Sequence, residues 1–99
     1  MHFPKYDLIN AEERALLSPD TFEIPPLDVR TSLEVGDFAK VIFSFGERIW
    51  IEIDEVVSPG FYAGVPVTQP VTVDIKIEEV DFEAKHVIAV QRNKEMFDS

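Results

Sequence analysis

The 99-residue sequence contains no cysteine, which excludes disulfide bonds, thiolate catalysis and zinc sites with cysteine ligands. It lacks an apolar run near the roughly 18 residues that span a membrane, and its first residues lack the apolar stretch of a secretory signal. Basic residues are scarce: nine Lys and Arg stand against nineteen Asp and Glu, for a net charge of −10. This excess of acid argues against binding to nucleic acid or anionic lipid, since both are polyanions. We therefore expect a cytoplasmic protein without membrane contact.

Histidine is also scarce, because only His2 and His86 are present. Hydrolysis by a serine nucleophile needs a base within hydrogen-bonding reach of the hydroxyl. His86 is predicted to open a strand, where a structural role is the common one. The sequence has no glycine-rich phosphate loop, no calcium loop and no zinc-ligand spacing. We therefore predict neither enzymatic activity nor a cofactor or metal ion.

Carboxylates occur in pairs that could flank a glycosidic bond or hold a hard cation. The pairs are Glu52 with Asp54, Glu78 with Glu79, and Asp81 with Glu83. Since 19 of the 99 residues are acidic, such pairs also arise on a solvated strand face that has no function. The solvated face is the simpler interpretation, and a small carboxylate-dependent hydrolase is kept as an alternative.

The sequence does contain enough apolar material for one packed domain, because 45% of its residues are hydrophobic and eight are Phe. We divide the chain into an N-terminal helix with a proline-rich arm (1–32), a β core (33–90) and a polar tail (91–99). Asn10 is a suitable cap for a short helix over 11–17, and Ser18-Pro19 ends that helix. Pro25-Pro26 makes the segment that follows extended.

Alternating apolar and polar residues predict the strands of the β core. The clearest strands, 38–45 and 48–56, form a hairpin that turns near Gly46. Further strands are expected over 61–67, 71–78 and 86–90, and Gly64 marks a bulge, a bend or a close backbone approach. Five short strands predict a mainly β fold, either a small barrel or a curved antiparallel sheet. An SH3-like barrel is favoured over an OB-fold, since only residues 68–70, too few for a helix, separate the third and fourth strands.

Residues 36–88 resemble a family of small, uncharacterised bacterial domains with the pattern G-D-x-V-K, E-R-x-W-V, V-x-F and H-I. The matching residues are Gly36-Asp37-Phe38-Ala39-Lys40-Val41, Glu47-Arg48-Ile49-Trp50-Ile51, Gly64, Gln69-Pro70, Val80-Asp81-Phe82 and His86-Val87. Gln69 stands where the family has Asn, and Glu78-Glu79 where a second Gly-Asp turn is expected. The resemblance implies a compact β-rich fold of unknown function. Related small domains are associated with immunity to secreted bacterial toxins.

One strand face combines a tryptophan with charges, because Arg48, Trp50, Glu52 and Asp54 point the same way along strand 48–56. Two interpretations are open. In the first, which we favour, residues 1–32 pack over Trp50, and Arg48 stacks on its ring. In the second, Trp50 anchors a binding surface and Tyr62 lies nearby. The candidate binding residues are then Arg48, Trp50, Glu52, Asp54, Tyr62, Glu78, Glu79 and Asp81.

The acidic charge, the missing catalytic set and the family resemblance together predict a non-catalytic interaction domain. Its expected partner is a basic protein, as for an immunity-type inhibitor of a toxin nuclease. A second interpretation is a nucleic-acid-mimicking decoy of a DNA-binding protein, which requires carboxylates in rows on one face. Its candidates are Glu52, Asp54, Glu55, Asp74, Glu78, Glu79, Asp81 and Glu83. Both a monomer and a homodimer are open, since an exposed edge strand can pair two copies.

Overall fold

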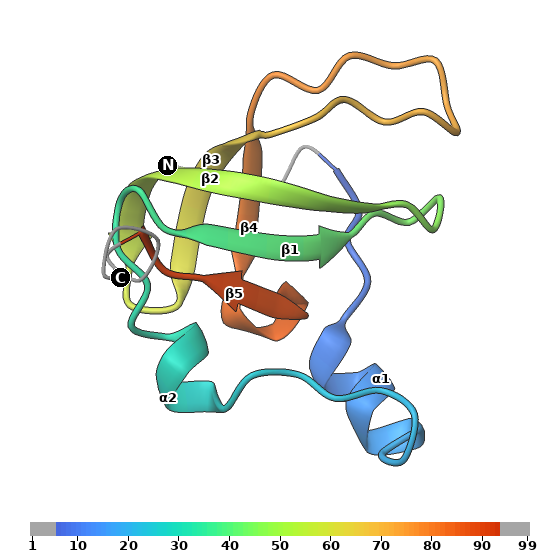
Figure 1. The fold of residues 1–99 in the computed structure, drawn as a ribbon, viewed down its shortest axis with the longest axis vertical. Coiled ribbons are helices and arrows are strands. Elements are labelled where there is room, and N and C mark those ends of the chain that lie inside the picture. The colour runs from blue at the N-terminus through green and yellow to red at the C-terminus, as the bar shows by residue number, and fades with distance from the viewer. Residues whose placement is uncertain (1–5, 94–99) are drawn as a thin grey trace.

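The computed structural model describes residues 6–93, which form a curved antiparallel sheet with short helices gathered at one end (Figure 1). The strands are β1 (Phe38–Ile42), β2 (Arg48–Ser58), β3 (Phe61–Pro66), β4 (Val80–Glu83) and β5 (Ala89–Gln91). The helices are α1 (Ala11–Leu17), α2 (Leu27–Arg30) and the 3₁₀ helix η1 (Ala84–His86). The strand order is β4-β3-β2-β1-β5, so β4 and β5 lie at its two ends and the sheet is not closed. The predicted mainly β fold with a short N-terminal helix is confirmed.

The predicted hairpin is confirmed and is the centre of the sheet. β1 and β2 pair antiparallel, with Val41 opposite Ile49. The chain turns at Gly46, whose φ of 92° lies in the left-handed region that favours glycine. The Gly46 N–H donates a hydrogen bond to the Phe43 carbonyl at 2.8 Å. The alternation along both strands places one set of apolar side chains on the inner face: Ala39, Val41, Phe43, Ile49, Ile51 and Ile53.

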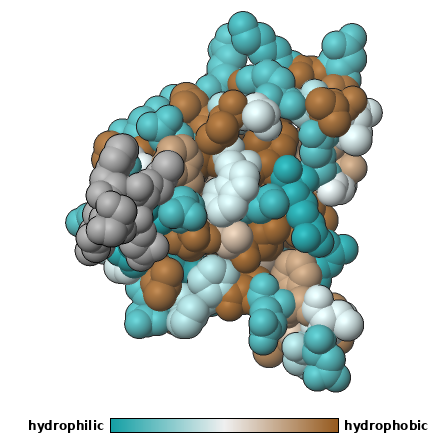
Figure 2. Space-filling model, viewed as in Figure 1, coloured by the Kyte–Doolittle hydropathy of each residue, from teal (hydrophilic) through white to brown (hydrophobic). Residues whose placement is uncertain are grey.

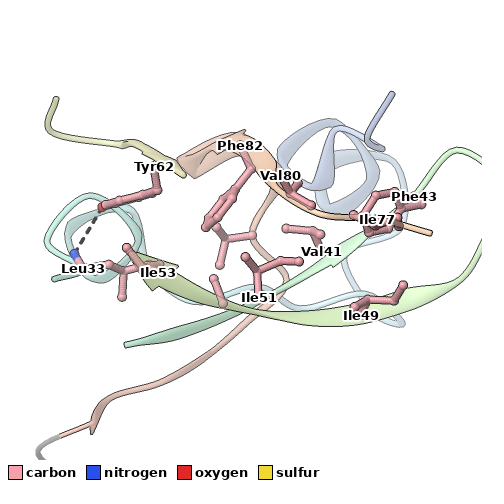
Figure 3. Packing of buried hydrophobic residues seen from close by; sticks show 12 residues of the cluster. Leu33, Val41, Phe43, Ile49, Ile51, Ile53, Tyr62, Ile77, Val80 and Phe82 are labelled. Atoms are coloured by element: carbon pink, nitrogen blue, oxygen red, sulfur yellow. Dashed lines mark hydrogen bonds between the residues drawn. The ribbon is translucent and has the colours of Figure 1, made fainter. Parts of the chain in front are cut away.

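The core lies between the two halves of the curved sheet. Figure 3 shows Val80 and Phe82 of β4 on the side of the core opposite Ile51 and Ile53 of β2. Tyr62 of β3 belongs to this core, and its ring lies 5.5 Å from that of Phe82. The Tyr62 hydroxyl donates a hydrogen bond to the Arg30 carbonyl at 2.8 Å and accepts one from the Leu33 N–H at 3.2 Å. The segment before β1 is therefore fixed to the core by a buried phenol.

The N-terminal helix begins and ends where the sequence predicts. The Glu13 N–H donates a hydrogen bond to the Asn10 side chain at 3.0 Å, which is the expected N-cap, and α1 ends before Ser18. The arm that follows contains one unpredicted turn of helix, α2, which starts directly after Pro26. Proline suits that position, because the first residues of a helix have no intrahelical partner for their N–H groups. Both helices contact η1, at the end of the sheet opposite the long loop in Figure 1.

One predicted strand is wrong and another is displaced. Residues 71–78 form no strand and belong instead to a long loop over residues 67–79, and the short β4 follows that loop. Pro66, which ends β3, and the nearby Pro70 have no N–H to donate to a continuing ladder, and the Glu47 and Gln69 side chains then bond Val71 and Ile77 in place of a neighbouring strand. The strand predicted over 86–90 is confirmed only at its end, because His86 ends η1 and β5 begins at Ala89. The predicted role of Gly64 is confirmed, since it pairs with Ile53 beside a register shift in β2.

Candidate binding face

The outer face of β5, β1 and β2 carries an open apolar depression of about 420 Å³, lined by Phe38, Trp50, Val67 and Gln91. Strand pairing brings these residues together. Phe38 of β1 lies opposite Gln91 of β5, and the Val67 N–H donates a hydrogen bond to the Trp50 carbonyl at 2.9 Å. Figure 2 shows hydrophobic residues interspersed with hydrophilic ones across this side of the molecule. We call these four residues the Trp50 depression.

The prediction that residues 1–32 cover Trp50 is wrong for the part that the structure describes. Residues 6–32 pack elsewhere: Leu8 pairs with Phe43, while α1 and α2 contact η1. Trp50 is therefore only half-buried. The cation over its ring is Lys40, whose Nζ lies 5.6 Å from the ring centroid, and not Arg48 as predicted. Lys40 lies directly opposite Trp50 in the hairpin, whereas Arg48 is exposed at the start of β2.

Acidic side chains continue along the same outer face. Glu52 is exposed and lies opposite Phe38 on β1 and opposite Val65 on β3. A register shift between Ile53 and Glu55 marks a β-bulge at Asp54, which is also exposed. Because Glu52 lies directly opposite Phe38, which lines the Trp50 depression, its side chain leaves the same face of the sheet beside that depression.

The remaining candidates do not join this site. Tyr62 is fully buried on the inner face of the sheet, so the prediction that it lies beside Trp50 is wrong. The reason is the alternation of β3, because Tyr62 shares a strand face with Gly64, which pairs with the inward-facing Ile53. Asp81 is buried on β4, where it pairs with Ala63. Glu78 and Glu79 are exposed in the loop that precedes β4, and β4 is separated from β2 by β3.

Sequence reasoning missed Phe38, Lys40, Val67 and Gln91. The alternation of strand 38–45 does place Phe38 and Lys40 on the face opposite Val41. Because this strand was predicted to pair with strand 48–56, both residues could have been assigned to the same face as Trp50. Val67 and Gln91 reach the depression through pairings with distant parts of the chain, for which the sequence offers no local signal.

His86 has a structural contact that fits the structural role expected for it. Its Nδ1 accepts a hydrogen bond from the Glu83 N–H at 3.0 Å, which caps η1. Burial lowers the pKa of His86 below the usual 6.5, and the neighbouring Lys85 lowers it further, while Glu83 and Glu12 oppose the change. The acceptor role and the lowered pKa agree, because only a neutral imidazole nitrogen can accept this bond.

We expect the stability of the domain to fall as the pH drops below about 6.5, the ordinary pKa of histidine. The folded state prefers neutral His86, so the unfolded chain binds the proton first and is favoured as the pH falls from that value through the lowered folded pKa. Urea unfolding at a series of pH values measures this. The control is His86→Asn, which keeps a side-chain acceptor and does not titrate. A constant difference between the two proteins from about pH 8 to about pH 5 would contradict the prediction.

A second hollow, of about 220 Å³, lies beside α1 and is lined by Ile9, Asn10, Glu13, Arg14 and Leu17. It contains one carboxylate.

Within residues 6–93 no helix has both the length and the apolar character needed to cross a membrane. The same residues contain no group of three or more His, Asp or Glu side chains placed to hold a metal ion.

Three comparisons with known proteins give no match. No family model fits the chain, and neither the curated proteins nor the solved structures include one with significant similarity to it. The resemblance to the small bacterial domain family stays a prediction from residues 36–88.

Proposed function

We propose that this protein is a non-catalytic interaction domain whose Trp50 depression binds a basic protein partner. The observation that carries the proposal is the meeting of half-buried Trp50, Phe38 and exposed Val67 with the carboxylate of Glu52 on one sheet face. A tryptophan in an apolar depression is a frequent anchor of protein interfaces. The depression supplies apolar contact area, and the acidic edge selects the charge of the partner.

Charge supports a basic partner over other kinds. The chain carries a net charge of −10, and Glu52, Asp54 and Glu55 follow one another along the exposed part of β2. Opposite charges across an interface raise the rate of association, and salt reduces this gain. The Lys40 ammonium already lies 5.6 Å from the Trp50 ring centroid, so we assign the attraction for a basic partner to the carboxylates and the apolar contact to the ring.

An immunity-type inhibitor of a basic toxin nuclease is the biological role that we infer for such a domain, in a cytoplasmic setting. We also propose that the five-stranded sheet is related to the SH3-like fold. Nucleic-acid mimicry is less well supported, because the candidate carboxylates are divided between β2, the loop over 67–79 and β4. Among them Asp81 is buried, and the Glu83 carboxylate lies 3.7 Å from the Lys85 ammonium.

Trp50 is the only tryptophan of the chain, so its fluorescence reports directly on the depression. The probe is a peptide of alternating Arg and Leu, compared with a peptide of alternating Glu and Leu of the same length. We expect the basic peptide to change the emission of Trp50 in a saturable way, and to bind more weakly as salt is added. Equal responses to the two peptides would contradict the proposal.

The matched variants are Glu52→Lys and Glu23→Lys, which make the same change in net charge at exposed positions. Glu52 borders the Trp50 depression, whereas Glu23 lies in the arm between α1 and α2. We expect Glu52→Lys to weaken binding of the basic peptide by about tenfold, as for the loss of roughly 1.4 kcal/mol, and Glu23→Lys to weaken it far less. Equal losses would show that only the total charge matters.

A further inference from the structure

The loop over residues 67–79 contains a regular alternating sequence that is typical of a strand, but it forms no strand. In Val71–Ile77 the apolar residues Val71, Val73, Ile75 and Ile77 alternate with Thr72, Asp74 and Lys76. Figure 1 shows the loop, coloured gold to orange between β3 and β4, projecting beyond the sheet. Val71 is 88% exposed and Ile75 is 44% exposed, which is unusual for residues in such a pattern.

Side chains hold this loop in place. The Glu47 carboxylate accepts hydrogen bonds from the Val71 N–H, the Thr72 N–H and the Thr72 hydroxyl at 2.7–3.0 Å, and these bonds lower its pKa. The Gln69 side chain donates to the Ile77 carbonyl at 2.8 Å and accepts from the Ile77 N–H at 2.7 Å. Gln69 thus takes the place of a neighbouring strand on one edge of the segment.

The opposite edge of the segment carries backbone groups that have no backbone partner among residues 6–93. In an extended chain, successive residues direct their N–H and C=O groups to opposite edges. Since the peptide groups of Ile77 face Gln69, those of Lys76 and Asp74 face away from it. Neither residue makes a backbone hydrogen bond within the described part of the chain, and both side chains are exposed.

We propose that this edge pairs with the same edge of a second copy of the chain, in an antiparallel register centred on Ile75. In that register Asp74 of each copy lies opposite Lys76 of the other, which gives two pairs of opposite charge. The same register sets Val73 opposite Ile77 and Ile75 opposite itself. The backbone groups of Asp74 and Lys76 form the hydrogen bonds, and Ile75 occupies the closer, non-hydrogen-bonded pair at the two-fold axis.

The charge pairs give the first test, by sedimentation equilibrium at about 0.15 M salt, where the Debye length is about 8 Å and the repulsion between two acidic bodies is screened. We expect a weak dimer in the wild type. Asp74→Lys and Lys76→Glu each place like charges opposite each other, and we expect each to weaken the dimer about tenfold or more.

Mixing the two single variants provides a rescue. In a mixed dimer the native Asp74 of one chain faces the native Lys76 of the other. The two introduced side chains, a lysine and a glutamate, also face each other, so both pairs attract. We therefore expect the mixture, and also the double variant D74K/K76E, to dimerise like the wild type. A wild type that is monomeric at all concentrations, or a mixture that associates no better than either variant alone, would overturn the proposal.

The absence of cysteine allows a second, independent test with a single introduced thiol. Residues directly opposite in a non-hydrogen-bonded pair have Cα atoms about 4.5 Å apart, which lies within the range of about 4.4–6.8 Å for a disulfide. We expect Ile75→Cys to form a disulfide-linked dimer readily. The control is Val71→Cys, which is more exposed but lies opposite Glu79 in the proposed register. Equal rates of crosslinking for the two variants, with unchanged circular dichroism, would overturn the proposed register.

Discussion

Replacing Gly64 by alanine is expected to destabilise the domain by about 3 kcal/mol or more, at the upper end of what overpacking costs. A Cβ atom at this position would overlap the backbone carbonyl oxygen of Glu52 and would lie 2.8 Å from Cγ2 of Ile51. Glu52 belongs to β2, which is paired on both sides, so its carbonyl cannot move without disturbing the pairing with β1 or β3. The space at Gly64, and not its backbone conformation, makes glycine necessary here.

Gly46→Ala is the matched control, because it also adds one Cβ atom, but at a position that has free space and a backbone conformation that favours glycine. A Cβ at Gly46 meets no atom within 4 Å, but the φ of 92° is one that alanine rarely adopts. We expect a loss of roughly 1–2 kcal/mol from this strain alone. Urea unfolding followed by Trp50 fluorescence measures both variants. If Gly64→Ala costs no more than Gly46→Ala, then β2 and β3 do not approach as closely as the structure indicates.

The sheet core could be predicted from the sequence because its signals are local. The alternation over 38–45 and 48–56 predicts both strands, their turn at Gly46 and the inward set from Val41 to Ile53, and the structure agrees. The strand predicted over 71–78 failed because alternation shows only that a segment suits a strand. Whether it becomes one depends on a neighbour, and here the Gln69 and Glu47 side chains take that place.

The candidate site was only partly predictable for the same reason. The period of two places Trp50 and Glu52 on one outer face, as the structure confirms, but it does not say what lies over that face. Tyr62 was misplaced because the register that sets Gly64 opposite the inward-facing Ile53, and the phenol's bonds to the segment before β1, arise from tertiary packing. The burial of the Arg30 side chain was likewise not predicted, because the residues around it in the sequence give no signal for it.

Arg30→Ala is expected to destabilise the domain by about 3 kcal/mol, because it leaves several acceptors, including a buried carbonyl, without a donor. The guanidinium is buried and joins three segments. Its Nε donates to the Pro25 carbonyl at 2.7 Å, and its Nη1 donates to the Glu12 carboxylate at 2.7 Å and to the Ala84 carbonyl at 2.8 Å. Truncation leaves these acceptors without their donor, and α1, the arm and η1 lose their common attachment.

Comparison with three further variants separates the charge from the hydrogen bonds. Glu12→Ala should cost less, about 1 kcal/mol, because the Glu12 side chain is 41% exposed and water can replace its partner. Arg30→Lys keeps the charge but lacks the planar fork that reaches several acceptors, so it should recover only part of the loss. Arg14→Ala removes an exposed arginine from α1 and should change stability by about 0.5 kcal/mol. A loss at Arg30 no larger than the loss at Arg14 would mean that the helices are held to the sheet by apolar contacts alone.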